Sequence, residues 1–230
     1  MRAVARPKSD LPQRIVHAAR SRFLHDGVDG ASLRGIAQDA GTNIGMVYYY
    51  YPTKDDLFLA VVEDVYGALL TQLVQVLSSE LPPEQRLRGL YARAAALDAR
   101  ELDVVRLVVR EALVSSERLA RVAARVQRGH LPLVLRTLVE GMASGRFEPS
   151  LHPIAATGAT ITLAIIPQLL HHVVAAAGLD IAKQLPSRAE VAELSFTTLL
   201  FGVAGPALRR PPSAAAKASR TLRGKRRAAT

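Results

Sequence analysis

Glycine and proline divide the N-terminal part of the chain into three short segments that each have the apolar spacing of a helix. Residues 10–25 and 33–40 repeat apolar side chains at intervals of three and four. The third segment, residues 45–51, is confined between Gly41 and Pro52, because the residue before a proline disfavours the helical region. Three short helices joined by tight turns predict a small helical domain with a helix-turn-helix arrangement.

The third segment contains four of the six tyrosines as one run, Tyr48 to Tyr51. In a helix, Tyr50 and Tyr51 share a face with Val47, whereas Tyr48 and Tyr49 lie on the opposing stripe. We expect the first pair to pack inward and the second to be exposed. Tyrosine hydroxyls donate hydrogen bonds to phosphate oxygens, and the rings can touch base edges in a major groove wide enough for a helix. The exposed pair therefore points to DNA binding.

The stretch GTNIGMVYYYYPTKDDLFLAV resembles the recognition-helix region of TetR-type transcriptional regulators, whose familiar form is G-V-S-x-G-T-L-Y-x-Y-F-x-x-K-x-x-L. The preceding SLRGIAQDAG resembles the family's T-x-x-x-I-A-x-x-A-G. The specific resemblance covers residues 9–60. Four positions depart from the family pattern, namely Thr42, Asn43, Met46 and Tyr51. Of these, Asn43 and Met46 suggest an operator preference of the protein's own.

The resemblance implies a set of DNA-contacting positions on the second and third segments and at the start of the next helix. This set is Ser32, Arg34, Thr42, Asn43, Ile44, Gly45, Met46, Tyr48, Tyr49 and Lys54. Within it, Tyr48 and Lys54 match the family's phosphate-contacting positions. Arg34 and Asn43 are the best base readers, since their donors can address guanine or adenine edges. The alternative is that the two tyrosines pack against a second domain and that Arg34 is only a surface charge.

The remaining sequence also has helical periodicity, so we expect an all-α protein. The expected parts are an N-terminal helix-turn-helix domain over residues 9–53, a larger helical ligand-binding and dimerisation domain over 54–208, and a basic disordered tail over 209–230. Thr53 and Asp56 form a capping-box pattern that opens a connecting helix to about residue 78. Further helices are expected over residues 83–97, 101–114 and 117–143, the last as one long helix.

Residues 154–177 and the segment after Ser187 are apolar nearly all round. The first is long enough to span a bilayer, but its proline, glutamine and two histidines disfavour insertion, so we expect a buried helix and no membrane partner. Helices without a polar face must bury against something. The family resemblance implies that this is a second copy, with the last two helices of each chain pairing in a four-helix bundle. Such a homodimer would place two recognition helices about 34 Å apart on a palindromic operator.

The middle helices are rich in leucine, valine and alanine, which predicts a pocket for a small, largely apolar effector. Polar side chains that could orient it are Tyr66, Tyr91, Arg106, Arg110, Glu111, His130, Gln168, His171 and His172. Arg106 and Arg110 could meet an anionic head group, or could be a solvated face paired with acids. The adjacent histidines point about 100° apart on a helix and make a poor metal site, so we expect no metal and no cofactor.

The formal net charge of +10 lies at the ends of the chain. The first eight residues hold three basic groups and the last 22 hold eight, with no acid in either, which leaves 19 basic against 20 acidic residues between them. We expect the tail to be a solvated arm, with non-specific phosphate contact as the sharper hypothesis. The absence of cysteine excludes thiol catalysis and disulfides, and the basic start leads into no signal-like apolar segment. A cytoplasmic protein is therefore expected.

The sequence contains no phosphate-binding glycine loop, nucleophile elbow or metal-ligand spacing, so we do not expect an enzyme. The favoured function is a homodimeric, sequence-specific regulator of a palindromic operator that a small apolar ligand releases, with repression implied only by the resemblance. Two alternatives stay open. One is an activator or structural DNA-binding protein without ligand response, and the other is a helical membrane-associated binding protein.

Overall fold

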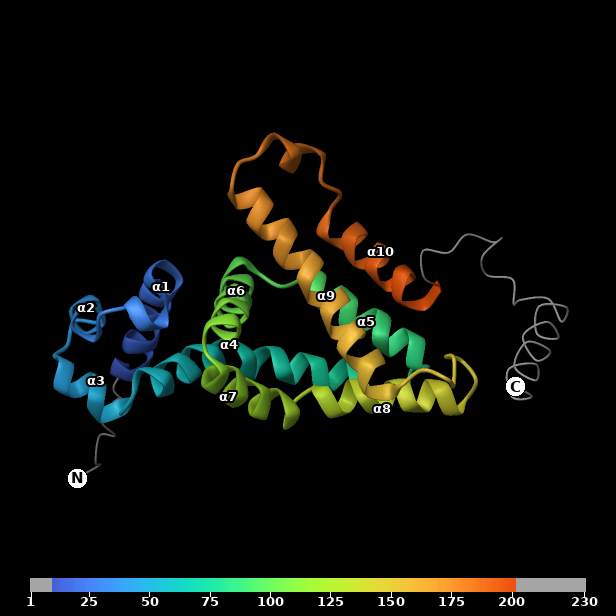
Figure 1. Ribbon diagram of the computed structural model, residues 1–230, viewed down its shortest axis with the longest axis horizontal. Coiled ribbons are helices and arrows are strands. Elements are labelled where there is room, and N and C mark those ends of the chain that lie inside the picture. Colours follow the sequence, from blue (N-terminus) through green and yellow to red (C-terminus); the bar gives the residue numbers. More distant parts are fainter. Residues whose placement is uncertain (1–9, 202–230) are drawn as a thin grey trace, which may run out of the picture.

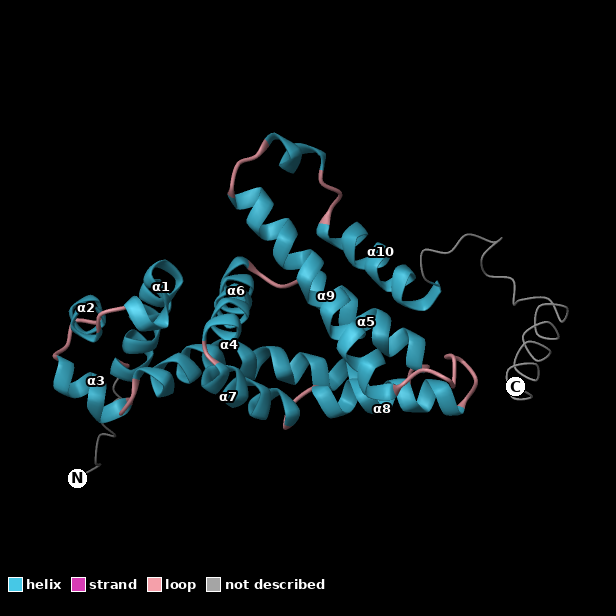
Figure 2. Cartoon of the chain, viewed as in Figure 1, coloured by secondary structure: helices cyan, strands magenta, loops and turns pink. Residues whose placement is uncertain are grey.

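The computed structural model describes residues 10–201, and within this range every regular element is a helix (Figures 1 and 2). The expected all-α fold is therefore confirmed. The expected tail, residues 209–230, and the last residues of the expected second domain lie outside the described part of the chain. The elements are α1 (Leu11–Gly30), α2 (Leu33–Asp39), α3 (Ile44–Tyr50), α4 (Lys54–Leu77), α5 (Pro83–Ala95), α6 (Ala99–Val114), α7 (Ser116–Gln127), α8 (Leu131–Ala143), α9 (Pro153–Ala176), η1 (Asp180–Gln184) and α10 (Arg188–Phe201).

Helices α1 to α3 lie at one end of the molecule and share an apolar core with α4 and α6 (Figure 1). Phe23, Ile36 and Val47, one from each of α1 to α3, are fully buried in the same cluster. The chain leaves the regular helix of α1 at Gly27, whose φ of 80° is a conformation that glycine adopts without steric cost. This early break lets the following helices fold back against α1.

Helix α4 connects this end to the rest of the molecule. It begins with a complete capping box, because the Thr53 side chain accepts from the backbone N–H of Asp56 while the Asp56 carboxylate accepts from that of Thr53. Its first half contributes Val61 to the core formed with α1 to α3, and its second half contributes Leu77 to a second core shared with α5, α8, α9 and α10. A displacement of α4 would therefore change the packing of both cores.

The expected single helix over residues 117–143 is wrong, because the structure has two helices, α7 and α8, with a turn between them. Gly129 lies in that turn against Tyr66, and a Cβ atom there would lie 2.0 Å from the tyrosine hydroxyl oxygen. Pro132 then stands in the first turn of α8, where its missing N–H costs no hydrogen bond. The break between α7 and α8 thus allows the turn at Gly129 to lie close to α4.

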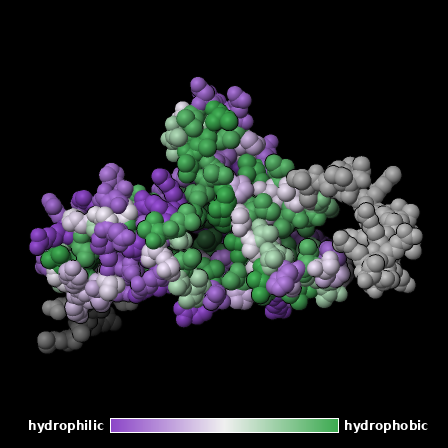
Figure 3. All heavy atoms as spheres, in the orientation of Figure 1, coloured by the Kyte–Doolittle hydropathy of each residue, from purple (hydrophilic) through white to green (hydrophobic). Residues whose placement is uncertain are grey.

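Helices α9 and α10 pair with each other (Figure 1). Both carry exposed apolar side chains. Figure 3 shows hydrophobic side chains covering the projecting part of α9. Among the largest exposed ones are Ile154, Leu170 and Leu194. By length and composition alone, α4 and α9 are the two helices of the described chain that could cross a membrane. For α4 its place in both cores explains the apolar composition, since the core helix of a soluble protein passes the same test.

Candidate DNA-binding surface and effector cavity

Helix α3 has one buried face and one face open to solvent. Val47 is fully buried, and Tyr50 and Tyr51 are partly buried against the core of α1 to α3. Tyr48 and Tyr49 retain 50% and 75% of their accessible surface. The inward and outward pairs predicted from helical spacing are therefore confirmed. Two phenol rings standing free on a short helix form a surface that can enter a groove.

Two of the predicted DNA-contacting residues are also helix caps. The Ser32 hydroxyl accepts from the backbone N–H of Gly35 at 3.3 Å, and the Asn43 Oδ1 atom accepts from that of Met46 at 3.0 Å. Because capping engages only the oxygen of Asn43, its amide N–H groups remain available as donors. Asn43 can thus hold the start of α3 and still address a base edge.

The other predicted DNA-contacting residues surround these caps. Arg34 and Gly45 are exposed, while Thr42, Ile44 and Met46 are half-buried. At the start of α4, the Lys54 Nζ atom donates to the backbone carbonyl of Asp29 at 2.7 Å. An ammonium has three protons, so this bond fixes the lysine and leaves donors for a phosphate. All ten predicted residues lie on α2, α3, their N-terminal turns and the first residue of α4.

A cavity of about 250 Å³ lies between α4, α5, α6, α7 and α9. Figure 3 shows a hollow bordered by hydrophobic residues near the centre of the drawn face. Valine, leucine, isoleucine and alanine side chains form almost all of its wall. The apolar members of the wall are Val62, Val65, Leu69, Leu73, Leu90, Ala94, Leu97, Val104, Val105, Val108, Val109, Val122, Val126, Ile161, Ala164 and Ile165. Such a wall suits a hydrocarbon group.

Among the polar side chains of the wall, Tyr66 contacts His130 and Arg93 pairs with Glu101. The Tyr66 hydroxyl lies 2.9 Å from Nδ1 of His130, and burial lowers the pKa of that histidine, which favours the neutral ring. Arg125 places its guanidinium 4.6 Å from the centre of the Tyr66 ring and makes two hydrogen bonds to Glu63. The contacts of Tyr66 and Arg125 hold α4, α7 and the start of α8 together at one end of the cavity.

Only Tyr66 and His130, of the nine predicted ligand residues, lie in this wall. Tyr91 is buried in the second core, where its hydroxyl donates to the carbonyl of Thr160 at 3.1 Å. Gln168 is buried and pairs with Arg188. The remaining residues lie elsewhere: Arg106 is exposed, His171 contacts the Pro186 carbonyl, His172 contacts Asp103, and Arg110 and Glu111 face α1. Composition could not reveal which helix faces enclose a cavity.

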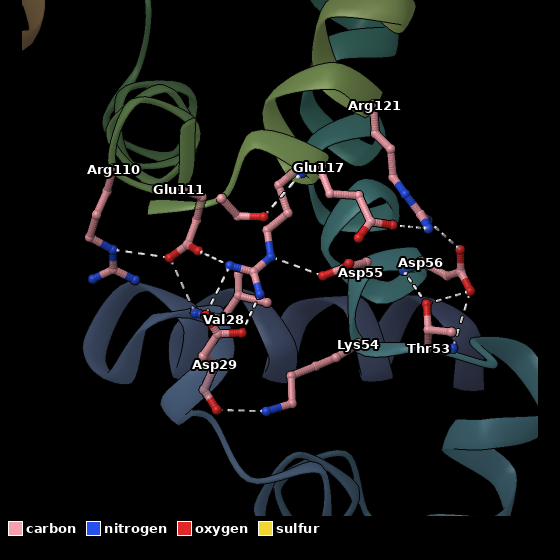
Figure 4. A network of polar contacts seen from close by, with 12 residues as sticks. Val28, Asp29, Thr53, Lys54, Asp55, Asp56, Arg110, Glu111, Glu117 and Arg121 are labelled. Carbon is pink, nitrogen blue, oxygen red and sulfur yellow. Dashed lines mark hydrogen bonds and ion pairs between the residues drawn. The ribbon is translucent and has the colours of Figure 1, made fainter. Parts of the chain in front are cut away.

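Arg110 and Glu111 belong instead to a polar network at the joint between α1, α4, α6 and α7 (Figure 4). The Glu111 carboxylate is 4% exposed and accepts from the backbone N–H of Val28 at 3.2 Å. Its second oxygen accepts from Arg118, a residue at the start of α7 that the sequence analysis did not single out. The available signal was the spacing of Arg118, Arg121 and Arg125, which places three cations along one side of α7.

Comparison with known proteins agrees with this architecture. The pattern of the family described as bacterial regulatory proteins, tetR family, matches residues 15–61. The chain is 30% identical over 135 residues to the HTH-type transcriptional repressor NicS of Pseudomonas putida, an alignment that covers 58% of this chain and 64% of that protein. It is 21% identical over 137 residues to the fatty acid metabolism regulator protein of Bacillus subtilis, covering 60% and 71% of the two chains.

Solved structures show the same fold. The transcriptional regulator FadR from Bacillus subtilis, solved in complex with stearoyl-CoA, matches with a TM-score of 0.67 and 17% identity over 84% of this chain and 99% of its own. AibR, solved in complex with isovaleryl coenzyme A and operator DNA, matches with a TM-score of 0.62 and 16% identity, covering 84% and 98%. The chain spans less than two thirds of the length of NicS, the repressor to which it is 30% identical. Residues 15–61 thus match the pattern of the tetR family of bacterial regulatory proteins, and the described chain shares the fold of the solved regulators to which it is similar.

Proposed function

We propose that this protein is a homodimeric transcriptional regulator that binds a palindromic operator as a repressor and is released by a small, largely apolar ligand. The observation that carries the proposal is the amphipathic placement of α3, with Val47 buried while Tyr48 and Tyr49 stand exposed on the opposite face. Because the core holds one face of α3 in place, the opposite face is a rigid surface that can enter the major groove of DNA. All ten residues predicted to contact DNA are compatible with this proposal.

Within that surface, the residues divide by chemistry. Tyr48 and Lys54 carry hydroxyl and ammonium donors that suit phosphate oxygens, and these contacts position the protein without reading sequence. Arg34 and Asn43 carry paired donors that distinguish base edges. Gly45 is exposed at the start of α3 and lets the backbone approach the groove closely.

Dimerisation through α9 and α10 follows from their exposed apolar faces. Ile154, Leu170 and Leu194 are 70%, 58% and 67% exposed in the single chain, and large exposed apolar side chains gathered on two paired helices suit an interface. A two-fold pairing of α9 and α10 would set the distance between two α3 helices. Occupation of successive major grooves requires that distance to be about 34 Å.

The effector that fits the cavity is a compound with a short or medium aliphatic part. FadR and AibR were solved with acyl derivatives of coenzyme A, and the apolar wall between α4 and α9 suits an acyl chain. A volume of about 250 Å³ accommodates only part of such a molecule, so its polar portion would remain outside the apolar wall. A protein that acts on chromosomal DNA belongs in the cytoplasm, where acyl-coenzyme A compounds occur.

The test is selection of random duplex DNA by the purified full chain at two salt concentrations, followed by titration of acyl-coenzyme A compounds of increasing chain length against the selected sequence. An enriched inverted repeat whose binding weakens as acyl compound is added supports the proposal. Binding to an inverted repeat that no compound alters favours the activator or structural alternative. Loss of all sequence preference, with binding that fades at the higher salt, would reject a role for α3 in recognition.

A further inference from the structure

Helix α7 takes part in both the effector cavity and the joint with the DNA-binding helices. Val122 and Val126, in its second half, form part of the cavity wall. Arg118, in its first turn, is only 7% exposed and reaches the joint. Two further arginines on the same helix pair with α4, Arg121 with Asp56 and Arg125 with Glu63. A rigid helix of 12 residues thus spans from the cavity to the base of the helix-turn-helix.

The Arg118 guanidinium joins three other elements. Its partners Asp29, Asp55 and Glu111 are labelled in Figure 4. Its Nε atom donates to Asp55 in the first turn of α4 at 2.9 Å, and Nη1 donates to Glu111 near the end of α6 at 2.6 Å. Nη1 and Nη2 also donate to the two carboxylate oxygens of Asp29, near the end of α1. Every donor nitrogen of this side chain is therefore engaged by an acceptor on a different helix from its own.

This cluster has a strong preference for one arrangement. Glu111 and Arg118 are both almost completely removed from solvent, so loss of the ion pair between them would leave each buried charge with fewer partners. The planar guanidinium demands its partners in fixed directions, so a shift of α7 cannot be absorbed by stretching the contacts evenly. A displacement of α7 must either carry α1 and α4 with it or exchange these partners.

We propose that Arg118 is a positioning residue that latches the helix-turn-helix to the effector cavity through α7. The inference rests on the proposed function and names the route by which that function is regulated. A group that fills the cavity presses on Val122 and Val126 and displaces α7. Arg118 then moves relative to Asp29 and Asp55, and the end of α1 and the start of α4 move with it. The placement of α3, and with it operator affinity, changes as a result.

A cavity-filling substitution tests the latch without any effector. Val126→Phe adds bulk to the wall on α7 itself and is combined with Arg118→Gln in a double-mutant cycle. In the otherwise unchanged chain, Val126→Phe is expected to weaken binding to the selected operator by about fivefold or more, the lower range of allosteric coupling. With Arg118→Gln present, the same substitution is expected to change the operator Kd by less than about twofold, because the route is broken.

Two further variants distinguish a loss of coupling from a loss of the folded state. Asp29→Asn removes one acceptor whose own side chain is 71% exposed, so the chain should fold while coupling is reduced. Arg128→Gln removes the same charge from an exposed position at the end of α7 and should leave the effect of Val126→Phe intact. A merely structural Arg118 would lower the melting temperature while leaving the effect of Val126→Phe unchanged.

Amide hydrogen exchange supplies a readout that does not depend on DNA. Val126→Phe is expected to raise exchange at residues 27–32 and 53–57 in the unchanged chain and not in Arg118→Gln or Asp29→Asn. Equal responses to Val126→Phe in all backgrounds, or no response in the unchanged chain, would overturn the latch. Failure of the chain to select any operator would reject the proposed function, whereas the exchange data would still decide whether the latch exists.

Discussion

The Asn43 Oδ1 atom accepts a hydrogen bond from the backbone N–H of Met46 at 3.0 Å, so the side chain proposed to read a base also caps the helix that presents it. The capping oxygen and the amide donors belong to the same planar group. Fixing the oxygen at the helix terminus therefore fixes the direction of the donors as well. Recognition and local stability are linked at this position, and substitutions can separate them.

Asn43→Asp should retain the helix cap but lose affinity for the operator. A carboxylate caps a helix N-terminus as well as an amide does, so the melting temperature should change little. The same carboxylate has no donor and would repel the phosphate backbone, so operator affinity should fall strongly. Asn43→Ala should lose both, with about 1 kcal/mol of stability removed. Thermal unfolding and operator binding, measured on the two variants side by side, check the separation.

Tyr49→Ala should change operator preference with little effect on stability. Its ring is 75% exposed and contacts the Tyr50 ring edge-on at a centroid distance of 5.1 Å. Substitutions at exposed positions usually stay within about 0.5 kcal/mol, and the loss of one edge contact adds little. Tyr50→Ala is the matched control, since it removes a partly buried ring and should lower stability more. Repeating the DNA selection with Tyr49→Ala checks the prediction, and an unchanged consensus at unchanged affinity would count against groove contact.

The orientation of α3 was predictable because local rules agree there. The spacing of three and four residues assigns Val47 and its neighbours to one face, and Gly41 and Pro52 leave little freedom for the ends of the helix. The capping box of Thr53 and Asp56 was readable for the same reason, as both partners lie within one turn. These two features could thus be derived from neighbouring residues of the chain itself.

The cavity was not predictable in this way. Its wall brings together residues from five helices, and a valine that lines it has no local feature to distinguish it from one packed in the core. Arg106 lies one residue from Val105 of the wall and yet is exposed, because adjacent helix residues point in different directions. The break between α7 and α8 did have a local signal in Gly129 and Pro132, which the apolar periodicity on both sides obscured.

Lys54→Gln should weaken binding to all DNA sequences alike. Loss of one phosphate contact reduces the slope of log affinity against log salt by about 0.9 per contact, or about twice that for a symmetric dimer. Because the ammonium also donates to the Asp29 carbonyl, a small loss of stability is expected with it. Titration of the selected operator and of an unrelated duplex across a range of salt concentrations checks the prediction. A loss confined to the selected operator would instead assign Lys54 to base reading.

Val105→Phe should lower the affinity for the effector. Val105 lines the cavity on α6 and lies outside both buried core clusters, so a larger ring there occupies ligand space before it strains the core. A ligand that loses room for about two methylene groups loses about 1.6 kcal/mol, or more than tenfold in affinity. Val139→Phe, at a valine that is 45% exposed on α8, is the control. Acyl-coenzyme A titrations of both variants check this, and equal ligand affinity would place the effector elsewhere.

The contact between Glu63 on α4 and Arg125 on α7 should lose its stabilising effect in acid. The hydrogen bond from Arg125 holds the pKa of Glu63 below its ordinary value of 4.5. A carboxyl group with a lowered pKa in the folded state adds stability above its unfolded pKa and loses it as the pH falls through the folded value. The stability difference between the unchanged chain and Glu63→Gln should therefore be constant from pH 7 to about 5 and shrink below 4.5. Urea unfolding of both chains, with the exposed Glu80→Gln as control, measures this difference. A difference independent of pH would mean that the ion pair contributes nothing and that Glu63 acts through packing alone.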